Sequence, residues 1–287
     1  MPYVPTRFSR RILDHVVLNL VDMPNHPLIL GIFGVPGDGK SFQLRNVLEK
    51  AEVSITTISA ANLESDRAGQ PGKDIQASYL RASRRIEAGG VAALVIDDID
   101  TTVGEWEHNS GTVNHQQVLA ELMHLADRPT RIENLTEAVR RVPVFVTGND
   151  FHKLYPPLRR AGRLWPLHWQ TSAQEREEVL CGVIGTIYRD LASDMVQKYP
   201  DQPVAFFVQA AQQAQLVLGQ DTLCRMHTQL ALVAHDPSRF RRYLSTAGVS
   251  QDAYRRAFED AANRLKLEEE LMQKSWLQSA NSTNSQS

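Results

Sequence analysis

Residues 34–41 read Gly34-Val35-Pro36-Gly37-Asp38-Gly39-Lys40-Ser41, a complete G-x-x-x-x-G-K-[ST] phosphate-binding loop, or P-loop. Successive backbone N–H groups of such a loop form a concave nest for an anion, and its glycines let the backbone approach phosphate oxygens without a clashing Cβ. Lys40 can reach the β and γ phosphates of a nucleotide, and the Ser41 hydroxyl can hold Mg²⁺. The alternative interpretation is a glycine-rich turn with a chance lysine.

The flanks of this loop have the pattern in which a P-loop works. A β-prone run over 28–33 precedes it, and an amphipathic helical pattern through Phe42, Leu44 and Val47 follows it. This arrangement places bound phosphates at a helix N-terminus. The residues that we expect to bind the nucleotide are Gly34, Val35, Pro36, Gly37, Asp38, Gly39, Lys40, Ser41 and Phe42.

The composition of the chain excludes several classes of protein. Its 287 residues allow about two domains, and a hydrophobic content of 42% is enough for their cores. A net charge of −2 leaves no global basic footprint for nucleic acid. The only cysteines, Cys181 and Cys224, are too few for a disulfide scaffold, and we find neither a signal peptide nor a long apolar run. We therefore expect a cytoplasmic enzyme with no nucleic-acid partner and no membrane segment.

Short β-branched runs alternate with helical patterns as far as residue 169, which is typical of a parallel sheet covered by helices. From the capping signal Thr171-Ser172-Ala173-Gln174-Glu175 onward the pattern is helical. We expect an N-terminal helical segment (1–26), an α/β nucleotide-binding domain (27–170), an α-helical domain (171–278) and a disordered tail or linker (279–287). The expected strands cover 28–33, 53–59, 92–96, 142–147 and 164–169. The expected helices between them cover 41–50, 73–87, 114–126 and a short piece at 151–155.

An apolar run ending in carboxylates, Ala92-Ala93-Leu94-Val95-Ile96-Asp97-Asp98-Ile99-Asp100, supplies the acidic group that a P-loop requires. Ligands of open α/β folds bind at the carboxyl ends of the strands. We therefore interpret this run as a Walker B motif, in which Asp97 holds Mg²⁺ through water and Asp98 polarises the attacking water. An acidic turn that caps a helix is the alternative.

Polar groups also accompany the two later strands. Asn149 follows the fourth strand and can hydrogen-bond the γ-phosphate or the attacking water, the role called sensor 1, although Gly-Asn-Asp is also an ordinary turn. Leu158-Arg159-Arg160-Ala161-Gly162-Arg163 places three guanidinium groups just before the fifth strand. Arginines at that point can stabilise charge on a phosphate bound by a neighbouring subunit, as a finger in trans. Isolated arginines are more often surface charges.

The order of these features is that of an AAA+ ATPase, and the chain resembles the rubisco activases over nearly all of its length. Peptides that carry the resemblance include Gly39-Lys40-Ser41-Phe42-Gln43, Ala68-Gly69-Gln70-Pro71, Ile96-Asp97-Asp98-Ile99-Asp100, Ala126-Asp127-Arg128-Pro129-Thr130 and Val146-Thr147-Gly148-Asn149-Asp150-Phe151. The resemblance implies an α/β fold, with an AAA+ parallel sheet in the strand order 5-1-4-3-2, followed by an all-α lid domain.

The resemblance also implies a function. Rubisco activases form a homo-oligomeric ring, expected to be a hexamer, that uses ATP, converted to ADP, and Mg²⁺ to remodel rubisco when tight-binding sugar phosphates block its active sites. Ser41 and Asp97 are then the metal-binding residues. The expected catalytic residues are Lys40, Asp97, Asp98, Asn149, Arg160 and Arg163.

Two loops occupy the positions at which AAA+ remodellers face a central pore. They cover 63–73, after the second strand, and 101–113, after the Walker B motif. Trp106 lies in the second loop, where an exposed aromatic side chain can grip an extended peptide, or where it simply packs locally.

The chain departs from the activases in its lid. Residues 205–213 carry no arginine, although activases place lid arginines that contact the nucleotide here, at the sensor 2 position. We therefore expect the coupling of hydrolysis to lid motion to be weakened, or to depend on another residue such as Arg225. The short N-terminus and the Ser/Asn tail indicate the cyanobacterial branch, whose members often continue into a domain that resembles the rubisco small subunit. This branch adds the carboxysome as a location. The alternative function is a nucleotide-regulated scaffold that clusters rubisco in carboxysomes and remodels it little.

Overall fold

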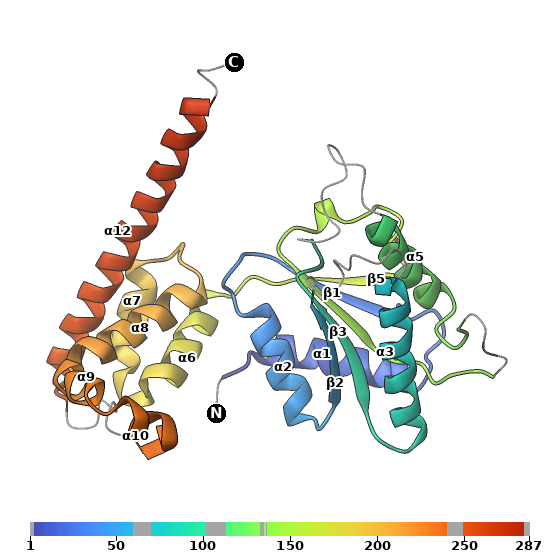
Figure 1. Cartoon of the computed structure of the whole chain (residues 1–287), viewed down its shortest axis with the longest axis horizontal. Helices are drawn as coiled ribbons and strands as arrows, with labels where there is room; N and C mark the ends of the chain where they lie inside the picture. Colours follow the sequence, from blue (N-terminus) through green and yellow to red (C-terminus); the bar gives the residue numbers. More distant parts are fainter. Residues whose placement is uncertain are drawn as a thin grey trace. The chain divides into compact units, whose positions relative to one another are not determined.

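The computed structural model describes residues 3–59, 70–100, 113–132, 135, 137–239 and 249–283, in two compact units (Figure 1). Val4–Gln170 forms an α/β unit, and Thr171–Ser287 together with Met1–Tyr3 forms a helical unit. The division between the two units falls between Gln170 and Thr171.

The α/β unit is built on a five-stranded parallel sheet in the order β2-β3-β4-β1-β5, which is the expected order read from the opposite edge. Its strands are β1 (Ile29–Phe33), β2 (Ser54–Ser59), β3 (Ala92–Asp97), β4 (Val144–Gly148) and β5 (Leu164–His168). Its helices are α1 (Thr6–Leu20), α2 (Lys40–Lys50), α3 (Gln70–Glu87) and α5 (Val113–Asp127), with a 3₁₀ helix η2 (Phe151–Lys153) after β4. Every strand and helix expected between residues 28 and 169 is present, with its ends shifted by a few residues.

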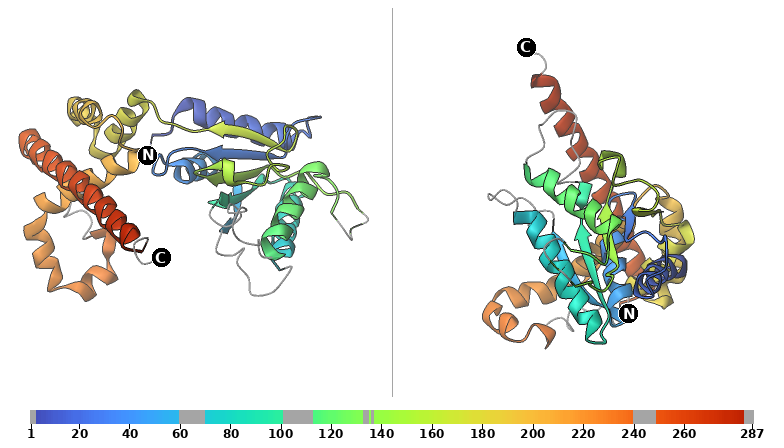
Figure 2. Two further views of the ribbon diagram at one scale, coloured as in Figure 1. Left: turned by 90° about the horizontal axis from the view of Figure 1, so that it is seen from above. Right: turned by 90° about the vertical axis from the view of Figure 1, so that its right-hand side faces the viewer.

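Helices cover both faces of this sheet (Figure 2). Because side chains alternate along a strand, Leu94 and Ile96 of β3 join the core under α3 and α5, whereas Ala93 and Val95 join the core under α1 and α2. Strands buried on both faces read as continuous apolar runs, which explains the run Ala92-Ala93-Leu94-Val95-Ile96. The polar ends of these strands are then left at the carboxyl edge of the sheet.

Helix α1 corrects one expectation about the domains. We expected residues 1–26 to form a helical segment outside the nucleotide-binding domain, but α1 belongs to the α/β unit. Phe8, Ile12 and Val16 are almost fully buried against the sheet, in the same cluster as Trp169. A helix with one apolar face gains stability by covering a sheet, and this burial fixes α1 there.

The helical unit is expected to be all-α, and it is so in its described part. It comprises α6 (Ala173–Ile184), η3 (Thr186–Tyr188), α7 (Arg189–Lys198), α8 (Val204–Leu218), α9 (Gln220–His227), α10 (Leu230–His235) and α12 (Gln251–Thr283). The expected helix start is confirmed, since Ser172 and Glu175 form a reciprocal capping box.

Small side chains bring α8 and α12 together. Ala210, Ala211 and Ala214 of α8 and Ala262 of α12 are buried, and the ring of Phe258 fills the space beside them. Helix α12 continues to Thr283, so the end of the helical part that we expected at residue 278 is too early.

Candidate functional site

The P-loop connects β1 to α2 in a backbone shape that requires its glycines. The φ angles of Gly34, Gly37 and Gly39 are 144°, 84° and 76°, values that residues other than glycine rarely adopt. A Cβ on Gly34 would also lie 2.0 Å from the carbonyl oxygen of Trp169, the residue that follows β5. These positions confirm the conformational reason for glycine in the motif.

Trp169 also holds the loop by two hydrogen bonds. Its backbone N–H donates to the Phe33 carbonyl at 2.7 Å, and its indole N–H donates to the Asp38 carbonyl at 3.1 Å. The indole is fully buried, packed edge-on against the ring of Phe8 from α1. The start and the middle of the P-loop are therefore fixed by the end of β5.

Lys40 lies inside the curve of the loop, with 6% of its surface exposed. Its ammonium donates to the carbonyl oxygens of Gly34 and Val35 at 2.8 and 3.0 Å, and to Oδ1 of Asn149 at 2.9 Å. Burial lowers the pKa of the Lys40 ammonium, and nearby carboxylates, first that of Asp38, oppose this shift. The structure thus brings together the loop lysine and the asparagine that we expected as sensor 1.

The acidic end of β3 lies beside the other end of the loop. Thr147, fully buried at the end of β4, donates a hydrogen bond to Oδ1 of Asp97 at 3.1 Å. The same Thr147 oxygen lies 3.1 Å from Oγ of Ser41 and accepts a bond from the backbone N–H of Asp98 at 3.2 Å. The Thr147 hydroxyl therefore connects the two expected metal-binding residues, Ser41 and Asp97, and also the backbone N–H of Asp98.

Arg45 of α2 is the second partner of Asp97. Its guanidinium forms a close ion pair with Oδ2 of Asp97 and also donates to Oγ1 of Thr57 at 3.3 Å. With Oδ1 bonded to Thr147 and Oδ2 paired to Arg45, the Asp97 carboxylate is held at both of its oxygens.

The pKa of the Asp98 carboxyl group is raised. Burial raises the pKa of its carboxyl group, and the neighbouring carboxylates of Asp97 and Asp100 raise it further. Its φ of 53° is in the left-handed region, which residues other than glycine seldom adopt. A carboxylate of raised pKa is a better acceptor for a proton from water.

The donor atoms of this site suit Mg²⁺ only in combination with a nucleotide. In the part of the chain that the structure describes, no three His, Cys, Asp or Glu side chains gather into a metal site. Oγ of Ser41 and Oδ1 of Asp97 share one hydrogen-bonding neighbour, and both are hard oxygen donors. Mg²⁺ characteristically takes one or two protein oxygens together with phosphates and water, so these residues fit the ion.

The two expected finger arginines differ in their surroundings. Arg163 donates to both carboxylate oxygens of Asp127, each at 2.7 Å, and to the carbonyl of Pro157 at 2.9 Å. Arg160 is exposed, and none of the described residues accepts a hydrogen bond from its guanidinium. Arg160 is the one whose charge is available to another molecule.

Three residues of the site were not assigned a role from the sequence. Arg45, Thr147 and Asp100 have polar or charged side chains, but each finds its partner on an element far away in the chain. The repeated carboxylates in Asp97-Asp98-Ile99-Asp100 were the only signal for Asp100. Phe42, expected in the nucleotide site, is 60% exposed on α2.

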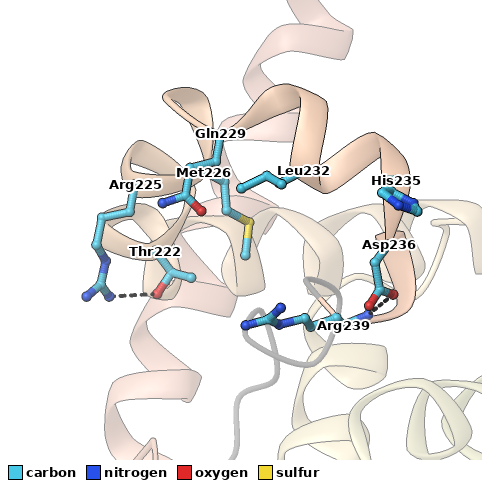
Figure 3. A pocket seen from close by; sticks show the side chains of 8 residues that line it. All are labelled: Thr222, Arg225, Met226, Gln229, Leu232, His235, Asp236 and Arg239. Carbon is cyan, nitrogen blue, oxygen red and sulfur yellow. Dashed lines mark hydrogen bonds between the residues drawn. The ribbon is translucent and has the colours of Figure 1, made fainter.

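The helical unit contains no arginine in 205–213, where α8 instead buries Phe206, Phe207 and Ala210. Arg225, the expected substitute, lies in α9 and hydrogen-bonds the Thr222 hydroxyl at 3.3 Å. It lines a pocket of about 620 Å³ within the helical unit, together with Leu232 and Arg239 among others (Figure 3).

Several expectations concern residues outside the described ranges. The first expected pore loop, 63–73, is described only from Gln70, where α3 begins, and the second, with Trp106, is described only at its last residue. Among the described residues, no helix is long and apolar enough to cross a membrane.

Comparison with known proteins extends this picture. The model of the family "ATPase family associated with various cellular activities (AAA)" matches residues 30–166. A chloroplastic ribulose bisphosphate carboxylase/oxygenase activase from Malus domestica is 37% identical over 214 residues, which are 71% of this chain and 49% of the relative. The activase of Anabaena sp. is 37% identical over 216 residues, 71% of this chain and 52% of the relative. The chain thus spans about half the length of the curated relatives that it matches.

Proposed function

We propose that this chain is an AAA ATPase related to the rubisco activases and that it hydrolyses ATP to remodel rubisco. In this proposal the protein releases inhibitory sugar phosphates from the active sites of rubisco and works as a homo-oligomeric ring. The observation that carries the proposal is the meeting of Lys40, Asn149 and the Asp97–Asp98 pair at one edge of the sheet.

The chemistry follows from this arrangement. The loop N–H groups and Lys40 would bind the β and γ phosphates, and Mg²⁺, held through Ser41 and Asp97, would neutralise developing charge on them. Asp98 would accept a proton from the attacking water. At the same time the oxygen of that water would bond to the γ-phosphorus, and the bond from the γ-phosphorus to the β,γ-bridging oxygen would break. Asn149 would orient that water or the γ-phosphate, and Arg160 of a neighbouring subunit would stabilise the transition state.

The ring and its location are part of the proposal. An exposed Arg160 suits a role across a subunit boundary, and AAA+ rings of this kind are expected to be hexamers. The pore loops, 63–73 and 101–113, would grip a segment of rubisco. A cytoplasmic or carboxysomal location agrees with a rubisco partner.

A nucleotide-regulated scaffold for rubisco is the second candidate. It is favoured by the lid, because α8 carries no arginine in 205–213 that could report the γ-phosphate to the helical unit. In this case nucleotide would control assembly, and rubisco would be clustered with little remodelling.

One experiment separates these two functions. Rubisco inhibited by a tight-binding sugar phosphate is incubated with the protein and either ATP or a non-hydrolysable analogue, and the recovery of carboxylation is followed. We expect carboxylation to recover with ATP and not with the analogue. We expect no recovery with the Lys40→Ala variant, because loss of the phosphate-binding charge lowers ATP turnover by about a hundredfold or more. Equal recovery with both nucleotides, or sedimentation of rubisco clusters without recovery, would support the scaffold.

A further inference from the structure

Asp100 is a buried carboxylate that the proposed chemistry does not use. It lies just beyond β3 and has 7% of its surface exposed. Its Oδ2 accepts two backbone hydrogen bonds, from the N–H of Asn149 at 2.7 Å and from the N–H of Asp150 at 2.8 Å. Bonds to an ionised acceptor are roughly twice as strong as neutral ones, so this carboxylate is a firm anchor for the backbone after β4.

These bonds begin where the sheet ends. The pairing of β3 with β4 ends at the register pair Ile96 and Val146. Beyond that point no backbone ladder joins these two strands among the described residues. The Asp100 side chain connects the segment after β3 to the segment after β4, because it accepts hydrogen bonds from the Asn149 and Asp150 N–H groups. The backbone N–H of Asn149, one residue beyond the β1–β4 pairing at Gly148, is therefore held by this carboxylate and not by a bond to β3.

Gly148 provides the space for this contact. A Cβ at residue 148 would lie 2.7 Å from Oδ1 of Asp100 and 2.8 Å from the ring of Phe151, both closer than real Cβ contacts. Oδ1 itself is buried and has no hydrogen-bond partner among the described residues. Burying a carboxylate with one unsatisfied oxygen is unfavourable, which indicates that the two bonds of Oδ2 outweigh the loss.

The anchored residue is the one that contacts the P-loop lysine. With its backbone N–H held by Asp100, Asn149 directs Oδ1 to the ammonium of Lys40 at 2.9 Å. Its amide therefore stands beside the group that would bind the γ-phosphate. A small rotation of the 149 peptide would move this amide away, and the hydrogen bond to Asp100 opposes that rotation.

Resting on the proposed function, we propose that Asp100 is the positioning residue of the γ-phosphate sensor, holding Asn149 where it distinguishes ATP from ADP. In this proposal Asp100 acts through its bond to the Asn149 peptide and not by contact with the nucleotide. The readout is therefore the ratio of the dissociation constants for ADP and ATPγS, measured by calorimetry in the absence of rubisco.

The test is a double-mutant cycle between Asp100 and Asn149. We expect Asn149→Ala to reduce the preference for ATPγS over ADP by about tenfold, the value of one good hydrogen bond. Asp100→Ala should cause a similar reduction, and the double variant should be no worse than Asn149→Ala alone, since coupled residues are not additive. A ratio unchanged in Asp100→Ala, or effects that add in the double variant, would overturn the proposal.

Two further variants guard against a purely structural effect. Asp100→Asn keeps the size and one acceptor oxygen but loses the charge, so we expect a smaller reduction in the ratio; a wild-type ratio in this variant contradicts the proposal even if Asp100→Ala does not fold. Ser83→Ala removes a different buried acceptor, which bonds the backbone N–H of Arg140 at 2.8 Å before β4. It should lower stability and leave the ratio unchanged.

This experiment is independent of the rubisco assay. If rubisco is not reactivated but the cycle behaves as expected, the proposed function fails and the sensor stands. If reactivation occurs but the two residues act additively, the sensor inference fails and the proposed function stands.

Discussion

Arg163 donates two parallel hydrogen bonds of 2.7 Å to the carboxylate of Asp127, the last residue of α5. The hydrogen bond from Arg163 lowers the pKa of Asp127, so the pair is ionised at neutral pH. The pair connects the segment before β5 to α5 within one α/β unit. Two N–H groups of the Arg163 guanidinium are thus already bonded to a carboxylate, in the paired geometry that arginine would otherwise offer to a phosphate.

This pairing predicts different outcomes for the two expected fingers. Arg160→Ala should lower ATPase activity by about a thousandfold or more, the usual value of an arginine finger, and mixing it with Asp98→Asn should restore some activity across subunits. Arg163→Ala should instead resemble Asp127→Asn, with a similar decrease in melting temperature in both. No restoration at any mixing ratio would argue against Arg160 acting in trans.

Thr147 is predicted to stabilise the α/β unit through the hydrogen bonds of its hydroxyl. Thr147→Val is nearly isosteric but leaves Asp97, the Asp98 N–H and Ser41 without their shared partner. We expect a loss of about 1–3 kcal/mol in the free energy of unfolding, measured in urea, because buried polar groups become unsatisfied. Thr147→Ser keeps the hydroxyl and should recover most of the loss; a Thr147→Ser variant as unstable as Thr147→Val would show that keeping the hydroxyl is not enough to restore stability.

Arg45 is predicted to weaken the binding of Mg²⁺. Its positive charge pairs with Oδ2 of Asp97 and competes with any cation that approaches that carboxylate. Arg45→Gln should therefore reduce the Mg²⁺ concentration that half-saturates binding of a fluorescent ADP by about three- to tenfold, a change of about 1 kcal/mol. Arg84→Gln, an exposed change on α3, is the control and should have no effect. An increased Mg²⁺ requirement in Arg45→Gln would show that Arg45 organises the site instead.

His15 is predicted to make the α/β unit sensitive to acid. It is fully buried on α1, and burial, with the charges of His26 and Arg141, lowers its pKa to about 3. Its stabilisation is complete above the unfolded pKa, near 6.5, and is lost as the pH falls from there toward 3, because only the unfolded chain takes up the proton. Between pH 7 and pH 5 this loss amounts to about 2 kcal/mol.

The measurement is urea unfolding of the wild type and of His15→Gln at both pH values. The variant should be less stable at pH 7 but should lose about 2 kcal/mol less on acidification. His152→Gln, on the exposed 3₁₀ helix η2, should keep the wild-type pH dependence. The same pH dependence in all three proteins would remove His15 as its source.

The sheet and the P-loop could be predicted from the sequence because both depend on local patterns. Each strand is a short apolar run, and the loop is one continuous motif. Arg45, Thr147 and Asp100 could not be assigned, because each has its partner on another element that comes close only when the sheet and its helices have assembled. The attachment of α1 could not be assigned either, because its apolar pattern does not say which surface covers it.

The arginines show a different limit. A cluster of three guanidinium groups indicated a site for anions, but only the positions of their neighbours separate a paired arginine from an exposed one. Asp127, the partner of Arg163, was present in a peptide shared with the activases, yet no spacing rule connects it to residue 163.

The contact of Gly34 with Trp169 involves the end of the α/β unit. The backbone of Gly34 passes so close to the Trp169 carbonyl that a Cβ there would lie 2.0 Å from its oxygen, and the Phe33 and Asp38 carbonyls both accept hydrogen bonds from Trp169. Trp169 stands two positions before Thr171, where the helical unit begins. The residue that holds the loop is thus separated from the first residue of the helical unit by Gln170 alone.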